Sequence, residues 1–95
     1  MTIQEKDFIL TPINDSTPKF DLELLYKIQA KGKDPRMEFK TVAFGISLEY
    51  AIRKIAQYRV TIKHEDEAIS IQTYFNEFKD ELDSIKNLCK ITDND

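Results

Sequence analysis

The amino-acid sequence predicts a small α+β domain in which an antiparallel sheet of two to three strands packs against two α-helices, in the order β-β-β-α-α. Apolar and polar residues alternate along Phe20–Lys31, which is the spacing of a strand with one buried face. After Gly45 the apolar spacing lengthens to three or four residues, which is the spacing of a helix. The 95 residues suffice for one domain, with a core at about 7–91 and flexible tails at 1–6 and 92–95.

Three segments have the character of strands. The apolar run Asp7–Ile13 contains Pro12, which is typical of an edge strand. The alternating strand Phe20–Lys31 follows, and a loop at Gly32–Pro35 returns the chain as the strand Arg36–Phe44. The residues that we expect to point inward from these last two strands are Phe20, Leu22, Leu24, Tyr26, Ile28, Ala30, Met37, Phe39, Thr41 and Ala43.

Three apolar residues occupy outward positions between charged neighbours: Leu25, Val42 and Phe44. If Lys31 pairs with Arg36, Leu25 lies opposite Val42, and a slip of two residues places it opposite Phe44 instead. Either register gathers an apolar patch on the outer face of the hairpin. Such patches mark interaction sites, so these three residues are the candidate partner-binding site. The alternative is that the first strand or the second helix covers them.

Local end signals predict the two helices. Gly45 lets the backbone turn sharply, and Ser47 is a suitable N-cap for a helix that begins at Leu48. The charged segment Lys63–Ala68 ends that helix, and Ser70 caps the second one. Its apolar face is formed by Ile71, Tyr74, Phe75, Phe78, Leu82, Ile85, Leu88 and Cys89.

The sequence offers little for catalysis, and we expect no enzyme, no catalytic residue and no cofactor. Two glycines in the whole chain exclude most phosphate-binding loops. The lone His64 is interpreted as a solvated loop residue, and no cluster of ligands accompanies it, so no metal site is expected. Cys89 is interpreted as a buried thiol, and a single cysteine suits the reducing cytoplasm. We expect no signal peptide and no membrane association.

Charge is distributed unevenly along the chain. Residues 19–63 carry ten Lys or Arg against five Asp or Glu, whereas residues 64–95 carry three against nine. The basic residues around the predicted hairpin tip are the candidate nucleic-acid site, since a basic hairpin can follow phosphates; they are Lys31, Lys33, Arg36 and Lys40. A further alternative is an acidic mimic of nucleic acid formed by Glu77, Asp80, Glu81 and Asp83.

The chain also resembles a family of small phage and prophage proteins of low-GC Gram-positive bacteria. The matching pieces are Lys31-Gly32-Lys33, Gly45, Leu48-Glu49-Tyr50-Ala51 and the helix from Ser70, and the resemblance spans Phe20 to Lys90. It implies a phage-encoded accessory protein in the host cytoplasm. The family has no established activity, so the resemblance implies no functional residue.

These observations together favour a binding protein. We expect the partner to be a host or phage protein, with a second copy of the chain as a further partner in a homodimer. Nucleic acid is the alternative partner.

Overall fold

The computed structural model describes residues 2–14, 18–29 and 31–93, although not the side chains of Asn14 and of residues 89–93. The fold is α+β, as predicted. Its elements are β1 (Ile3–Gln4), β2 (Phe8–Asn14), β3 (Lys19–Ile28), β4 (Arg36–Ser47), α1 (Leu48–Lys63) and α2 (Ile71–Asp93). The chain divides into two compact units, a sheet unit at Met1–Ala51 and a helical unit at Ile52–Asp95.

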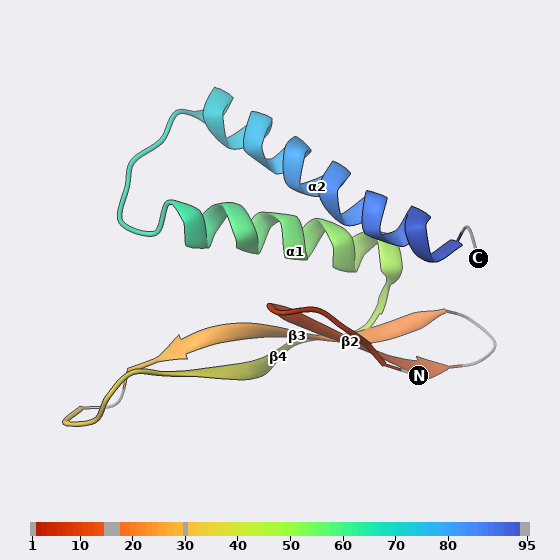
Figure 1. The fold of residues 1–95 in the computed structure, drawn as a ribbon, viewed down its shortest axis with the longest axis horizontal. Helices are drawn as coiled ribbons and strands as arrows, with labels where there is room; N and C mark the ends of the chain where they lie inside the picture. The colour runs from red at the N-terminus through yellow and green to blue at the C-terminus, as the bar shows by residue number, and fades with distance from the viewer. Residues whose placement is uncertain (1, 15–17, 30, 94–95) are drawn as a thin grey trace. The chain divides into compact units, whose positions relative to one another are not determined.

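The sheet has four antiparallel strands in the order β1-β2-β3-β4. Figure 1 labels β2, β3 and β4. The sequence predicted at most three strands, and the missed one is β1. Its two residues pair with β2 at Leu10 and Ile9. A strand of two residues has no periodicity of its own, so only its neighbour in the fold defines it.

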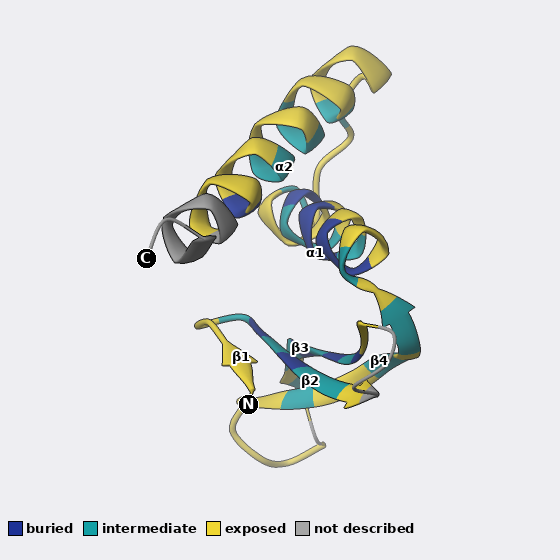
Figure 2. Ribbon diagram, turned by 90° about the vertical axis from the view of Figure 1, so that its right-hand side faces the viewer, coloured by how far each residue is buried: buried dark blue, intermediate teal, exposed yellow. Residues whose placement is uncertain are grey.

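One face of β2 and β3 forms the core of the sheet unit. Phe8 lies opposite Leu24 and Leu10 lies opposite Leu22, so these side chains share a face. All four are buried, as is Phe20 (Figure 2). The predicted inward direction of Phe20, Leu22 and Leu24 is therefore confirmed. Burial stops there: Tyr26 and Ile28 are only half-buried, and they lie beyond the last residue of β3 that pairs with β2. The predicted inward Ala30 lies outside the described part of the chain.

The prediction that β2 is an edge strand is wrong, because β2 lies between β1 and β3. Pro12 is opposite Phe20 of β3, whereas β1 pairs with β2 only at Ile9 and Leu10. Strand β1 does not extend to Pro12, so no hydrogen bond to β1 is lost because proline has no N–H. This explains how a proline is accommodated in an internal strand.

The predicted hairpin register is also wrong. Ile28 lies opposite Arg36, so the connection spans residues 29–35, and Leu25 lies opposite Phe39 instead of Val42 or Phe44. The sequence had suggested a shorter loop, and register follows loop length. Because opposite residues share a face, Met37, Phe39 and Thr41 point away from the buried face. Of the return-strand residues predicted to point inward, only Ala43, opposite Leu22, does so.

Two irregularities change the register within β4, one at Val42 and one at Phe44–Gly45. The strand slips against β3 between Thr41 and Ile46, and the backbone at Gly45 has a φ of 60°. The Gly45 N–H donates a hydrogen bond of 3.0 Å to Oδ1 of Asp21. Left-handed backbone in a bulge is a position that favours glycine. The sequence predicted that the backbone turns sharply at Gly45. This prediction is wrong, because β4 continues to Ser47.

Both helices begin where the sequence predicted. The Tyr50 N–H donates to the Ser47 Oγ, and the Thr73 N–H donates to the Ser70 Oγ, each at 3.1 Å. These contacts are N-caps, which satisfy a donor that the first helical turn leaves free. Neither helix, over its described residues, is long and apolar enough to cross a membrane. The buried residues of the two helices are Ala51, Ile52, Ile55, Ala56, Val60 and Ile85.

Candidate interaction surfaces

The face of the sheet opposite the buried one carries an apolar surface. Its residues follow from the strand register: Ile9 lies opposite Glu23, Leu25 opposite Phe39, and Lys27 opposite Met37. Phe44 joins them because the irregularity at Gly45 places Phe44 and Gly45 across from Asp21. The neighbours of Asp21, Phe20 and Leu22, are on the buried face, so Asp21 is on the outer one. We call this set the outer-face surface; it consists of Ile9, Leu25, Met37, Phe39 and Phe44.

Exposure differs across the outer-face surface. Phe44 is 75% exposed and Met37 is 57% exposed. Ile9, Leu25 and Phe39 are half-buried. At the Phe44 end, Cδ1 of Ile13 lies 3.5 Å from where a Cβ on Gly45 would be, and Ile13 is itself exposed. Leu25 and Phe39 in the middle of the surface are thus partly covered, whereas Met37 near the start of β4 and Phe44 near its end are exposed.

The structure only partly assembles the three residues that the sequence selected. Leu25 and Phe44 belong to the outer-face surface, but Leu25 lies opposite Phe39 and not opposite Phe44. Val42 is the additional residue of the other irregularity, between the pairs that Thr41 and Ala43 make with β3, and it is half-buried. Sequence reasoning missed Met37 and Phe39 here because the assumed register directed both inward.

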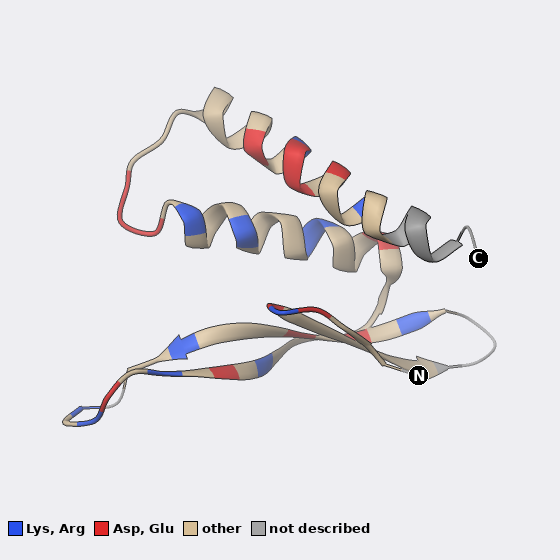
Figure 3. Cartoon of the chain, viewed as in Figure 1, with Lys and Arg blue, Asp and Glu red and all other residues tan. Residues whose placement is uncertain are grey.

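The basic hairpin residues are all exposed, but acidic residues lie among them. Blue and red segments alternate along the start of β4 in Figure 3, where Arg36, Glu38 and Lys40 follow one another at every second position. Arg36 Nη2 lies 3.4 Å from Glu38 Oε2. Lys40 lies opposite Leu24, so these three side chains share the face away from the outer-face surface. Lys31 and Lys33 belong to the loop, with Asp34 beside them.

In the helical unit, charged side chains connect the two helices. Lys63 Nζ lies 2.6 Å from Glu77 Oε1, and His64 Nε2 lies 2.6 Å from Glu77 Oε2. His64 Nδ1 is 3.3 Å from Glu67 Oε1, and Arg59 Nη1 is 3.5 Å from Glu81 Oε2. With a side chain only 16% exposed, His64 is not the solvated loop residue that we predicted. Its partner Glu77 is 13 positions away, so no local pattern indicates the contact.

Glu77 and Lys63 shift each other's ionisation. The hydrogen bond from Lys63 is the main cause that holds the pKa of Glu77 below its usual value of 4.5, and His64 acts in the same direction. The same hydrogen bond raises the pKa of Lys63 above its usual 10.5. Both groups therefore stay charged over a wider pH range than they would alone.

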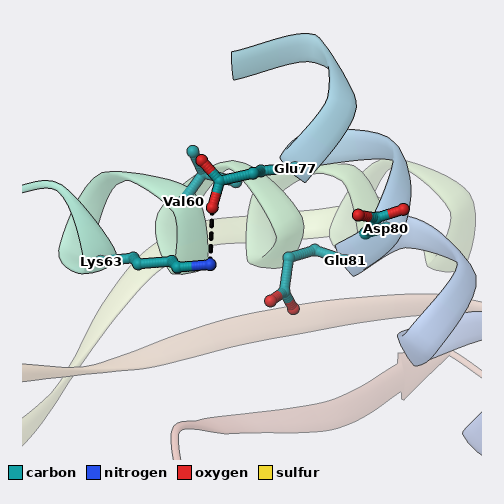
Figure 4. Close-up of a pocket in the computed structure, with 5 residues that line it drawn as sticks. All are labelled: Val60, Lys63, Glu77, Asp80 and Glu81. Atoms are coloured by element: carbon teal, nitrogen blue, oxygen red, sulfur yellow. Dashed lines mark ion pairs between the residues drawn. The ribbon is translucent and has the colours of Figure 1, made fainter. Parts of the chain in front are cut away.

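The acidic row on α2 is partly neutralised by these contacts. Glu77 and Glu81 are bound by cations of the chain itself, whereas Asp80 and Asp83 are exposed. Figure 4 shows the small pocket beside the row, which is lined by Val60, Lys63, Glu77, Asp80 and Glu81. Its volume of about 50 Å³ accommodates no more than a few waters. In the described part of the chain, no three His, Cys, Asp or Glu side chains gather into a group that could hold a metal ion.

A second set of apolar side chains is exposed on α2. Ile71 is 73% exposed and Phe75 is exposed as well. The ring of Tyr74 stacks on Phe78, with centroids 6.0 Å apart, and meets Phe75 edge-on at the same distance. The side chain of Cys89, which we predicted to be buried, lies outside the described residues.

Comparison with known proteins adds nothing to this description: no protein-family model matches the chain, and no curated protein and no solved structure matches it either.

Proposed function

We propose that the chain is a protein-binding module that acts without catalysis and contacts its partner through the outer-face surface. The observation that carries this proposal is that Phe44, 75% exposed, and Met37, 57% exposed, lie on the same sheet face as the half-buried Leu25 and Phe39. A strand face that leaves aromatic and aliphatic side chains in water is unfavourable until it is covered, and exposed apolar side chains gathered on one face mark interaction sites. In keeping with the resemblance above, the partner we propose is a host or phage protein in the cytoplasm of a low-GC Gram-positive bacterium.

Two features distinguish this surface from the alternatives. Aromatic residues and methionine are enriched at protein interfaces, and the outer-face surface offers Phe39, Phe44 and Met37. A nucleic-acid site would instead need an uninterrupted set of cations, and Glu38 pairs with Arg36 within the basic hairpin. The acidic mimic is weakened in the same way, since Glu77 and Glu81 are occupied by Lys63 and Arg59.

The decisive variant is Phe44→Lys, because Phe44 is the most exposed member of the surface and its loss removes little internal packing. The tagged full-length chain is used to capture proteins from a low-GC Gram-positive lysate, and mass spectrometry identifies those that untagged chain displaces. We expect Phe44→Lys to abolish capture of the displaced protein. Val42→Lys is a poorer choice, since Val42 is half-buried at the bulge.

Ile71→Lys is the matched control, because it makes the same kind of change at a 73% exposed apolar residue of α2. We expect it to retain capture, and circular dichroism should show both variants folded. Equal capture by wild type, Phe44→Lys and Ile71→Lys contradicts the proposal.

The nucleic-acid alternative has its own test. Binding of duplex and single-stranded DNA and RNA is measured at about 50 mM salt, where phosphate contacts are strong. If binding occurs, Lys31→Ala with Lys33→Ala should weaken it and reduce its salt dependence by about one unit per lost contact. Absence of binding under these conditions eliminates this alternative.

A further inference from the structure

Strand β4 leaves one long edge of the sheet without a neighbour. In the sheet order β1-β2-β3-β4, and over the residues that the structure describes, β4 pairs with β3 on one side only. The opposite edge of the sheet is β1, which has two residues, whereas β4 has twelve. A long free edge presents unpaired N–H and C=O groups to any other extended chain, and proteins commonly keep such edges short or charged.

The charges on this edge follow a self-complementary order. Arg36, Glu38 and Lys40 alternate in sign along one face of β4, and all three are exposed. Charges of a single sign would repel a second copy. An alternating series can instead place acid opposite base when two copies of the same strand run antiparallel.

Only some antiparallel registers achieve that match. A two-fold axis at Glu38 would place Glu38 opposite itself and Arg36 opposite Lys40, which are like charges. An axis at Lys40 would place Lys40 opposite itself. An axis at Met37 would match Arg36 with Glu38, but it would leave a ladder only three residues long, because β4 begins at Arg36.

An axis at Phe39 places opposite charges across from each other and also leaves a longer ladder. It places Glu38 of each copy opposite Lys40 of the other, and the ladder covers Met37–Thr41, up to the bulge at Val42. On the other face, Phe39 meets Phe39 and Met37 meets Thr41. Aromatic cross-strand pairs are favourable in antiparallel ladders, and this pair would cover part of the exposed apolar edge.

We propose that two copies of the chain pair through their β4 strands, antiparallel and centred on Phe39, to form one continuous sheet of eight strands. The occupant of the free edge is thus a second copy of this chain. The pairing uses the edge of the sheet and engages Phe39 and Met37, but it leaves Ile9, Leu25 and Phe44 uncovered, so the dimer would present two such sets of residues side by side. The inference does not depend on the proposed function, since an edge-paired dimer can exist whether or not that face binds a target.

Sedimentation equilibrium of the full chain tests the pairing at about 100 µM protein and low salt, conditions that favour a weak dimer by mass action. We expect wild type to be dimeric and Glu38→Lys to weaken the dimer about tenfold or more, because both acid–base pairs become repulsive. Glu65→Lys changes the net charge equally at an exposed residue outside the sheet and should leave the dimer intact.

The double variant Glu38→Lys with Lys40→Glu tests the register. It exchanges the two partners and so restores the acid–base pairs only if Glu38 faces Lys40 of the other copy. We expect it to recover dimerisation. A monomeric wild type, an unaffected Glu38→Lys or a failed recovery overturns the proposal.

Cross-linking provides an independent readout that does not depend on charge. In a Cys89→Ser background, Phe39→Cys should form an intermolecular disulfide rapidly, since the axis places that residue opposite its own copy within reach of a disulfide. Thr41→Cys should not, because it faces Met37 of the other copy. Equal cross-linking at both positions overturns the register. Target capture by the outer-face surface is a separate measurement, so failure of either proposal is recognised without the other.

Discussion

The sheet unit and the helical unit use different physical means to define their structure. In the sheet unit, apolar side chains from β2 and β3 are buried along one face, and the Gly45 N–H donates a hydrogen bond to the Asp21 carboxylate. In the helical unit, charged groups connect the end of α1 to α2 through Glu77 and Glu81. Burial depends little on pH, whereas ion pairs depend on it directly. The two units should therefore respond to different perturbations.

The largest effect should come from the buried face of the sheet. Leu22 is fully buried, opposite Leu10 on one side and Ala43 on the other. Leu22→Ala should cost about 2–5 kcal/mol of unfolding free energy, because it removes buried apolar atoms and leaves a cavity. Urea denaturation of the full chain measures the change.

Lys27 and Ile28, near the end of β3, serve as controls for the loss at Leu22. Ile28→Ala should cost clearly less than Leu22→Ala, because Ile28 is half-buried beyond the last pair with β2. Lys27→Ala changes an exposed side chain, and it should alter the unfolding free energy by no more than about 0.5 kcal/mol in either direction. Equal losses at Leu22 and Ile28 would show that the hairpin beyond β2 is as well packed as the rest of the sheet.

Backbone conformation should give the next largest effect in the sheet unit. Gly45 has a φ of 60° and Gly32 has a φ of 77°, and any other residue is strained there. Gly45→Ala should cost about 1–2 kcal/mol. A Cβ there would make only ordinary contact with Ile13, so the cost comes from the backbone. Gly32→Ala should cost less, since an open loop can relax. A larger loss at Gly32, measured by the same urea titration, would contradict this ranking.

What the sequence predicted well was local. The N-caps at Ser47 and Ser70 each depend on contacts within three residues, and the inward direction of Leu22 and Leu24 depends on alternation alone. These signals need no knowledge of the rest of the fold.

What the sequence could not predict was set by contacts between distant segments. The register of β3 and β4 depends on a loop length that Gly32–Pro35 did not reveal, and the irregularity at Gly45 depends on Asp21, which is 24 residues from Gly45. For this reason the candidate site was only partly found. Leu25 and Phe44 were selected as breaks in polarity, whereas Met37 and Phe39 were assigned to the wrong face.

The two helix caps should have similar, smaller effects. Ser47→Ala and Ser70→Ala should each cost about 1 kcal/mol, because each removes the acceptor for one N–H of the first turn. The cap distances are equal at 3.1 Å, although Ser47 ends a strand and Ser70 follows a loop. Thermal unfolding followed by circular dichroism at 222 nm, the helix band, measures both. A much larger loss at Ser47 would mean that this residue also holds the end of β4 in place.

The smallest effect should be the dependence of the helical unit on pH. The pKa of Glu77 is lowered by Lys63 and His64, so its contribution to stability is fully present above its usual value of 4.5 and is lost as the pH falls through the lower folded value. The pKa of Lys63 is raised by Glu77, so its contribution is fully present below 10.5 and is lost as the pH rises through the higher folded value. Glu77→Gln should remove both dependences. The difference in melting temperature between wild type and Glu77→Gln should be greatest near neutral pH and shrink toward either extreme. Asp83→Asn removes the same charge at an exposed position of α2 outside the pocket, and its difference from wild type should stay small throughout. If Glu77→Gln and Asp83→Asn showed the same profile, the contacts of Glu77 with α1 would contribute nothing specific, and burial alone would define both units.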